Sequence, residues 1–187
     1  FLEKILVTEQ KAGRNPDDIT VMAVTKTVPA EIVNAALACG IRVIGENRVQ
    51  EFLEKEPLYH LQGKAVHFIG TLQRNKVKYI ASKVDRIESV SSLKLAQEID
   101  RQCGMIGKLM PVLVEVNIGG EDSKTGADIA ALEELLSGVS VLPNLSVKGL
   151  MAIPPASDDY ATQRRYCAEM YKLFIDIKSK RIDNINM

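Results

Sequence analysis

Apolar residues occur along this chain in short β-branched runs that alternate with longer segments of helical spacing. Residues 19–29 begin with such a run, which predicts a strand that is apolar on both faces and hence buried, as in parallel sheets covered by helices. Further strands are predicted at residues 41–45, 65–70, 86–90, 110–118 and 145–153. Helices are predicted at residues 1–14, 30–39, 48–55, 72–83, 91–103, 128–136 and 158–180, and residues 182–187 look like the start of another strand.

This alternation predicts an α/β fold with a parallel sheet and right-handed crossovers, because no hairpin signal joins neighbouring strands. An open doubly wound sheet and a closed (β/α)8 barrel both satisfy the pattern. The barrel is favoured, since no G-x-G-x-x-G follows the first strand and the strand–helix units continue evenly. A barrel needs eight strands, so we expect a further C-terminal segment after Met187 and a single barrel domain over residues 1–187.

Charge and cysteine content narrow the function classes. The 24 basic and 24 acidic residues cancel, so no overall field favours nucleic acid or an anionic membrane. The three cysteines lie far apart, which is typical of inert thiols in a reducing cytoplasm. His60 and His67 are the only histidines and lack a carboxylate at ligand spacing, so no metal site is predicted. No apolar run is long enough to cross a bilayer.

The residue with the clearest chemical potential is Lys26, at the end of the first predicted strand and just before Pro29 opens a helix. Ligands of parallel β/α folds collect beyond the carboxyl ends of the strands. A charged amine there is costly to desolvate unless it is paired, neutral or used covalently. The alternative is a lysine with a buried stem and an ammonium group that reaches water.

Other strand ends carry weaker candidates. Asn47 follows the second strand, where it could orient a polar ligand or simply cap the next helix. The glycine-rich loop at residues 117–126 lacks P-loop spacing and could be a mobile loop over a ligand or a plain solvated loop. Residues 149–153 end the sixth strand and could flank a flat ring or fill a barrel interior.

Five groups of residues occur in the order and spacing of one known family: 23–27, 45–51, 67–76, 116–124 and 149–151. In these groups the chain resembles the pyridoxal phosphate (PLP) homeostasis family, also called the YggS/PROSC family. The resemblance extends over essentially the whole chain, with one departure at Thr71, where the family frequently has histidine.

The resemblance implies a (β/α)8 TIM barrel of the PLP fold-type III kind, like the N-terminal domain of alanine racemase, here lacking most of strands seven and eight. It implies that PLP is the cofactor, held as a Schiff base on Lys26, with Asn47 near the ring and Met151 at the same mouth of the barrel. The family's phosphate cradle comes from the segment around strands seven and eight, which would follow Met187.

A cytoplasmic carrier that takes part in PLP homeostasis is therefore the expected function, without catalytic residues or established catalysis. Its expected partners are the small-molecule cofactor and apo PLP enzymes, and we expect a monomer that binds neither nucleic acid nor membrane. A PLP-dependent amino-acid racemase-like enzyme is the alternative, although racemisation needs a base on each face of the ring. A third reading is an aldolase-like barrel in which Lys26 condenses with a carbonyl substrate.

Overall fold

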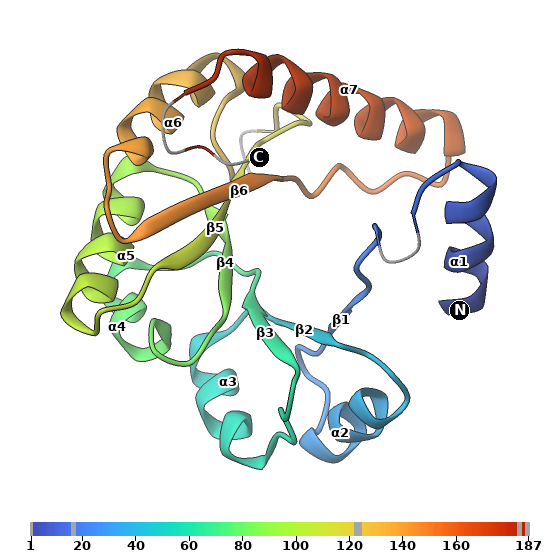
Figure 1. Cartoon of the computed structure of the whole chain (residues 1–187), viewed down its shortest axis with the longest axis vertical. Coiled ribbons are helices and arrows are strands. Elements are labelled where there is room, and N and C mark those ends of the chain that lie inside the picture. The colour runs from blue at the N-terminus through green and yellow to red at the C-terminus, as the bar shows by residue number, and fades with distance from the viewer. Residues whose placement is uncertain (1, 16–17, 122–124, 183–184, 186–187) are drawn as a thin grey trace. The chain divides into compact units, whose positions relative to one another are not determined.

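The computed structural model describes residues 2–15, 18–121, 125–182 and 185 as a regular alternation of strands and helices (Figure 1). The strands are β1 (Met22–Val24), β2 (Val43–Glu46), β3 (Ala65–Phe68), β4 (Arg86–Val90), β5 (Met110–Glu115) and β6 (Leu145–Met151). The helices are α1 (Leu2–Lys11), α2 (Ala30–Ala38), α3 (Val49–Lys55), α4 (Val77–Ile80), α5 (Leu93–Met105), α6 (Leu132–Ser140) and α7 (Tyr160–Ser179). Short 3-10 turns lie at Glu56–Leu58, Arg74–Lys76 and Ile129–Ala131.

The strand order in the sheet is β1-β2-β3-β4-β5-β6, which follows the chain. The pairs β1–β2, β4–β5 and β5–β6 are parallel, as the lack of hairpin signals predicts. The predicted class of fold, a parallel sheet alternating with helices, is therefore confirmed. The chain forms two compact units, Phe1–His67 and Phe68–Met187. A single closed barrel domain stays a prediction.

In the first unit, β1 and β2 pair in parallel with Met22 opposite Val43 and Val24 opposite Gly45. The ladder continues one residue further, because the Thr25 amide donates a hydrogen bond to the Gly45 carbonyl at 3.0 Å. On β1 the face that continues to Thr25 is the buried one, whereas β2 is buried on both faces. The hydroxyl of Thr25 on this face donates a hydrogen bond to the buried carboxylate of Glu46.

The prediction that the first strand is buried on both faces is wrong. The strand is only three residues long, and Ile19 and Val24 are 42% and 50% exposed. A continuous apolar run is compatible with burial on both faces of a strand. Whether both faces are buried depends on which segments of the chain cover them. The chain also turns directly after Thr25, so strand alternation does not extend to Lys26.

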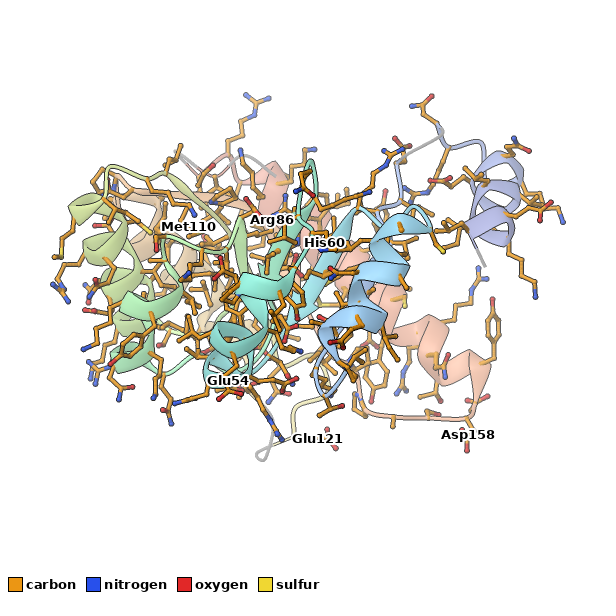
Figure 2. The ribbon with its side chains drawn as sticks, turned by 90° about the horizontal axis from the view of Figure 1, so that it is seen from below. Glu54, His60, Arg86, Met110, Glu121 and Asp158 are labelled. Carbon is orange, nitrogen blue, oxygen red and sulfur yellow. The ribbon has the colours of Figure 1, made fainter. Side chains whose placement is uncertain are left out.

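In the second unit, β5 and β6 pair along their whole length, with a register shift at Lys148. Val147 lies opposite Val112 and Gly149 opposite Leu113, so Lys148 is an extra residue, and its side chain is exposed. Such a bulge moves the residues that follow it to the other face of the strand. Met110, labelled in Figure 2, is fully buried at the start of β5.

Several predicted boundaries agree closely with the structure. β4 has the predicted bounds, and α5 begins after Ser92, whose hydroxyl accepts the Leu95 amide as an N-cap. The helix predicted at residues 72–83 is instead a 3-10 turn followed by the short α4. In the run predicted to start a seventh strand, Ile185 forms an isolated parallel bridge with Val147.

No helix in the described ranges is both long enough and apolar enough to span a bilayer. The described residues also contain no group of three His, Cys, Asp or Glu side chains that could hold a metal ion.

Candidate functional site

Lys26 lies in a tight turn at the carboxyl end of β1. The Val28 amide donates a hydrogen bond to the Thr25 carbonyl at 3.1 Å, which closes a four-residue turn with Lys26 at its first central position. Thr27, at the second central position, has a φ of +61°. Positive φ is rare for a β-branched residue and costs conformational energy. The turn therefore presents the lysine from a strained backbone.

The Lys26 side chain is exposed, and no residue in the described ranges lies within hydrogen-bond or ion-pair distance of its ammonium group. The structure thus places the amine where the sequence predicts, at a strand end, but does not bury it. Its accessibility leaves the nitrogen open to a small molecule approaching from solvent.

A buried polar cluster adjoins the turn, next to Thr25. Glu46, the last residue of β2, is fully buried, and its Oε1 accepts hydrogen bonds from the Thr25 hydroxyl at 2.7 Å and the Tyr59 hydroxyl at 2.5 Å. Burial raises the pKa of Tyr59 to about 12, and the hydrogen bond to the Glu46 carboxylate adds to this effect. Tyr59 is therefore a neutral donor at physiological pH.

Lys55, the last residue of α3, carries the positive charge of this cluster, and its side chain is only 13% exposed. Its Nζ donates to the Thr25 carbonyl at 2.9 Å and lies 3.0 Å from Glu46 Oε1 and 2.8 Å from Glu51 Oε1. Burial alone lowers the pKa of Lys55, but the hydrogen bonds to Glu51 and Glu46 outweigh it and raise the pKa above its ordinary value. Glu54, labelled in Figure 2, lies on the exposed side of the same helix.

Glu51 connects this cluster to the residue that follows Lys26, Thr27. Its Oε1 accepts the Thr27 amide at 2.5 Å as well as the Lys55 ammonium. The hydrogen bond from Lys55 is the main cause that holds the pKa of Glu51 below its usual value. Glu51 is therefore a carboxylate at neutral pH and a strong acceptor for the turn amide.

Asn47 directly follows β2, beside the strand end that carries Lys26. In the β1–β2 register, Thr25 falls beside Glu46, as their hydrogen bond requires, and Asn47 is the next residue along β2. Asn47 Oδ1 is buried and has no hydrogen-bond partner among the described groups. A buried acceptor without a donor is costly, so this oxygen fits a ligand that brings a hydroxyl or N–H group.

Met151 ends β6 in the second unit, where it is half-buried. Its carbonyl accepts the Val116 amide at 2.8 Å, and in the β5–β6 register it lies opposite Glu115. The bulge at Lys148 places Met151 on the face of Glu115 rather than on that of Val147. Part of the glycine-rich loop predicted beside it, including Ser123 and Lys124, lies outside the described residues.

The first unit also has a cavity of about 220 Å3, but at the other end of β1. Its walls come from α1 and from residues just before β1 and β2, including Thr20 and Arg42. Ligand sites of parallel sheets lie beyond the carboxyl ends of the strands, so we place the candidate site at Lys26 and not in this cavity.

The contacts that Glu46, Glu51 and Lys55 make with the turn are not predicted by the sequence. Glu51 and Lys55 stand four residues apart on a predicted helix, a spacing that brings opposite charges together on one face. That spacing is visible in the sequence, but the contact with the turn at Lys26 depends on the strand register.

Comparison with known proteins defines the class of this chain. The profile of the family described as "Alanine racemase, N-terminal domain" matches residues 5–185. Alanine racemase from Clostridium difficile 630 has the same fold, with a TM-score of 0.73 at 15% identity over 98% of this chain and 48% of that one.

Closer relatives narrow the class. The pyridoxal phosphate homeostasis protein of Aquifex aeolicus is 40% identical over 92% of this chain and 75% of its own length. The protein of the same name from Escherichia coli K12 is 35% identical over 99% of this chain and 81% of its own length. The structure of PipY from Synechococcus elongatus, determined with PLP bound, has a TM-score of 0.84 at 29% identity over 95% of this chain and 84% of that one. The chain belongs to the alanine racemase N-terminal domain family and, within it, to the pyridoxal phosphate homeostasis proteins.

Proposed function

We propose that this chain binds pyridoxal phosphate at Lys26 and takes part in PLP homeostasis as a carrier of the cofactor. The observation that carries the proposal is the Lys26 amine, which stands unpaired among the described residues on a turn at the carboxyl end of β1. The names of the relatives from Aquifex aeolicus and Escherichia coli, and the PLP bound in PipY, support the choice of ligand.

PLP would supply an aldehyde, a carbonyl carbon that a lysine amine can attack, and Lys26 would hold the cofactor through its amine. The chain's own part is to hold the backbone turn from which that nitrogen extends. The unpaired Asn47 Oδ1 would accept a hydrogen bond from a ligand hydroxyl, and a buried acceptor satisfied in this way favours binding. Met151, at the end of β6 in the second unit, stays a prediction from the family resemblance.

We infer a carrier, not an enzyme, because the relatives from Aquifex aeolicus and Escherichia coli are named homeostasis proteins. Lys55 and Tyr59 are both held by Glu46 beside the turn. The likeness to alanine racemase at 15% identity concerns the fold and lends no support to racemisation. We propose the cytoplasm as its location and apo PLP enzymes as its partners, in keeping with three cysteines that are all free thiols.

The test is covalent trapping at one equivalent of PLP, followed by borohydride reduction and peptide mapping by mass spectrometry. We expect the added mass on the peptide that contains Lys26, and its loss in Lys26→Ala. Lys11→Ala, which removes an exposed lysine at the end of α1, is the matched control and should label like the wild type. Equal labelling of Lys26→Ala and the wild type would refute the assignment. Turnover of amino acids at ordinary enzymatic rates would refute the carrier role.

A further inference from the structure

The turn that carries Lys26 has a conformation that the sequence does not favour by itself. A β-branched threonine occupies the position of positive φ, where glycine or asparagine is usual. Backbone strain of this kind persists only where the surrounding structure imposes it, and it is concentrated at functional sites.

The contacts that impose this conformation come from one helix and bind the turn from both ends. Lys55 Nζ donates to the carbonyl of Thr25, before Lys26, at 2.9 Å, and to the carbonyl of Val28, after it, at 3.4 Å. Glu51, one helical turn earlier on α3, accepts the amide of Thr27. Three backbone groups flanking Lys26 are thus bound by two side chains that also bind each other at 2.8 Å.

Glu46 supports the pair formed by Lys55 and Glu51. Its buried carboxylate lies 3.0 Å from Lys55 Nζ and accepts the Thr25 hydroxyl. It therefore binds both the turn and the pair of side chains that holds the turn, Lys55 and Glu51, which we call the clamp. A lysine between two carboxylates and two carbonyls has all its donors occupied. Lys55 is therefore unavailable as a nucleophile, whereas Lys26, four atoms of flexible side chain beyond the turn, is free.

We propose that Lys55 and Glu51, supported by Glu46, are positioning residues that hold the strained turn and so direct the cofactor aldehyde to Lys26. The proposal rests on the proposed function, since it concerns how the same lysine is presented. It adds that the rate and site selectivity of attachment depend on side chains that never touch the ligand.

The first arm of the test needs no cofactor. Hydrogen exchange of the Thr27 and Val28 amides, followed by NMR, reports whether the turn is held. In Lys55→Met we expect both amides to exchange at least tenfold faster at a temperature where the variant remains folded. Lys108→Met is the matched control, because Lys108 Nζ likewise binds two carbonyls, those of Ala81 and Val84, in the second unit. It should leave both amides unchanged.

The second arm measures the initial rate of borohydride-trapped labelling at Lys26 with one equivalent of PLP. Misplacement of a reacting group costs roughly 10- to 100-fold in rate. We expect a loss of that size in Lys55→Met and none in Lys108→Met. An unchanged rate in folded Lys55→Met, or an equal loss in both variants, would overturn the positioning role.

A milder pair of variants keeps the test decisive if Lys55→Met fails to fold. Glu51→Gln retains an oxygen that can accept the Thr27 amide, whereas Glu51→Ala removes it. We expect fast Thr27 exchange and slow labelling in Glu51→Ala, with recovery toward the wild type in Glu51→Gln. Equal behaviour of the two would contradict the inference. If the turn amides of the wild type are protected but Lys26→Ala is labelled normally, Lys55 and Glu51 do hold the turn. The assignment of PLP to Lys26 would then be wrong.

Discussion

Two lysines in this chain perform the same task in different settings. Lys55 binds the carbonyls of Thr25 and Val28 in the first unit, and Lys108 binds those of Ala81 and Val84 in the second. Each lysine side chain thus ties down a short segment of backbone between a helix and a strand or turn.

The surroundings of the two lysines differ in charge and in what they hold. Lys108 has no carboxylate within ion-pair distance among the described residues, whereas Lys55 has both Glu46 and Glu51. The segment held by Lys108 has negative φ values throughout, while that held by Lys55 includes Thr27 at +61°. Carbonyl binding is enough for an unstrained segment, and we infer that the added carboxylates serve the strained one.

The largest effect is expected from Lys55→Met. Removing one partner of a buried ion pair leaves the other uncompensated, and Glu46 is fully buried. We expect a loss of about 3 kcal/mol in the free energy of unfolding, measured by urea denaturation. A loss below about 1 kcal/mol would mean that the charges around Lys55 contribute no more than its carbonyl contacts.

The next largest effect is expected at alkaline pH, where the cluster around Lys55 should lose stability because Tyr59 belongs to it. The pKa of Tyr59 is raised to about 12 by burial and by Glu46, above the ordinary value of about 10 in the unfolded chain. A group with a raised folded-state pKa stabilises fully below the unfolded value and loses that contribution as pH rises through the folded one. We therefore expect the loss of stability between pH 10 and 12 to be about 2 kcal/mol smaller in Tyr59→Phe than in the wild type.

The same titration carried out on Lys108→Met should keep this alkaline loss, because Lys108 does not belong to the cluster around Tyr59. If the free energy of unfolding depends on pH in the same way in Tyr59→Phe and the wild type, the neutral Tyr59 hydroxyl does not contribute to stability.

Lys108→Met should have a smaller effect on stability than Lys55→Met. It leaves two carbonyls without their donor but creates no unpaired buried charge, which predicts a loss of about 1 to 2 kcal/mol. The exposed Lys94 on α5 is the control, and Lys94→Met should change the free energy of unfolding by less than about 0.5 kcal/mol. Equal losses of stability in Lys55→Met and Lys108→Met would show that the carboxylates beside Lys55 add nothing to its carbonyl contacts.

The sequence predicts the alternation of strands and helices well because periodicity and capping are local signals. Ser92 before α5 and the bounds of β4 are examples. The position of Lys26 at a strand end follows from the same signals. The exposure of Val24 does not, since it depends on which segments cover each face of the sheet.

The remaining parts of the candidate site depend on register, which the sequence does not reveal. The cluster joins Thr25, Glu46 and Lys55, which lie on separate elements and meet only because β1 and β2 pair as they do. The bulge at Lys148 reverses the face on which Met151 lies, and Gly149, which directly follows Lys148 and has a φ of +156°, is a sequence signal that could have indicated it.

The smallest and most specific effect concerns Thr27. Glycine adopts positive φ without a Cβ penalty, which is about 1 to 2 kcal/mol for other residues, but its flexibility in the unfolded chain offsets about half of that. Thr27→Gly should therefore raise the free energy of unfolding by less than about 1 kcal/mol. If the clamp exists to hold strain, removing the strain should make the clamp less necessary. Thr27→Gly should then recover more stability in Lys55→Met than in the wild type, while in Lys108→Met its effect should match that in the wild type. A double-mutant cycle measures this coupling directly, and strict additivity with Lys55→Met would show that the turn and its lysine are energetically independent.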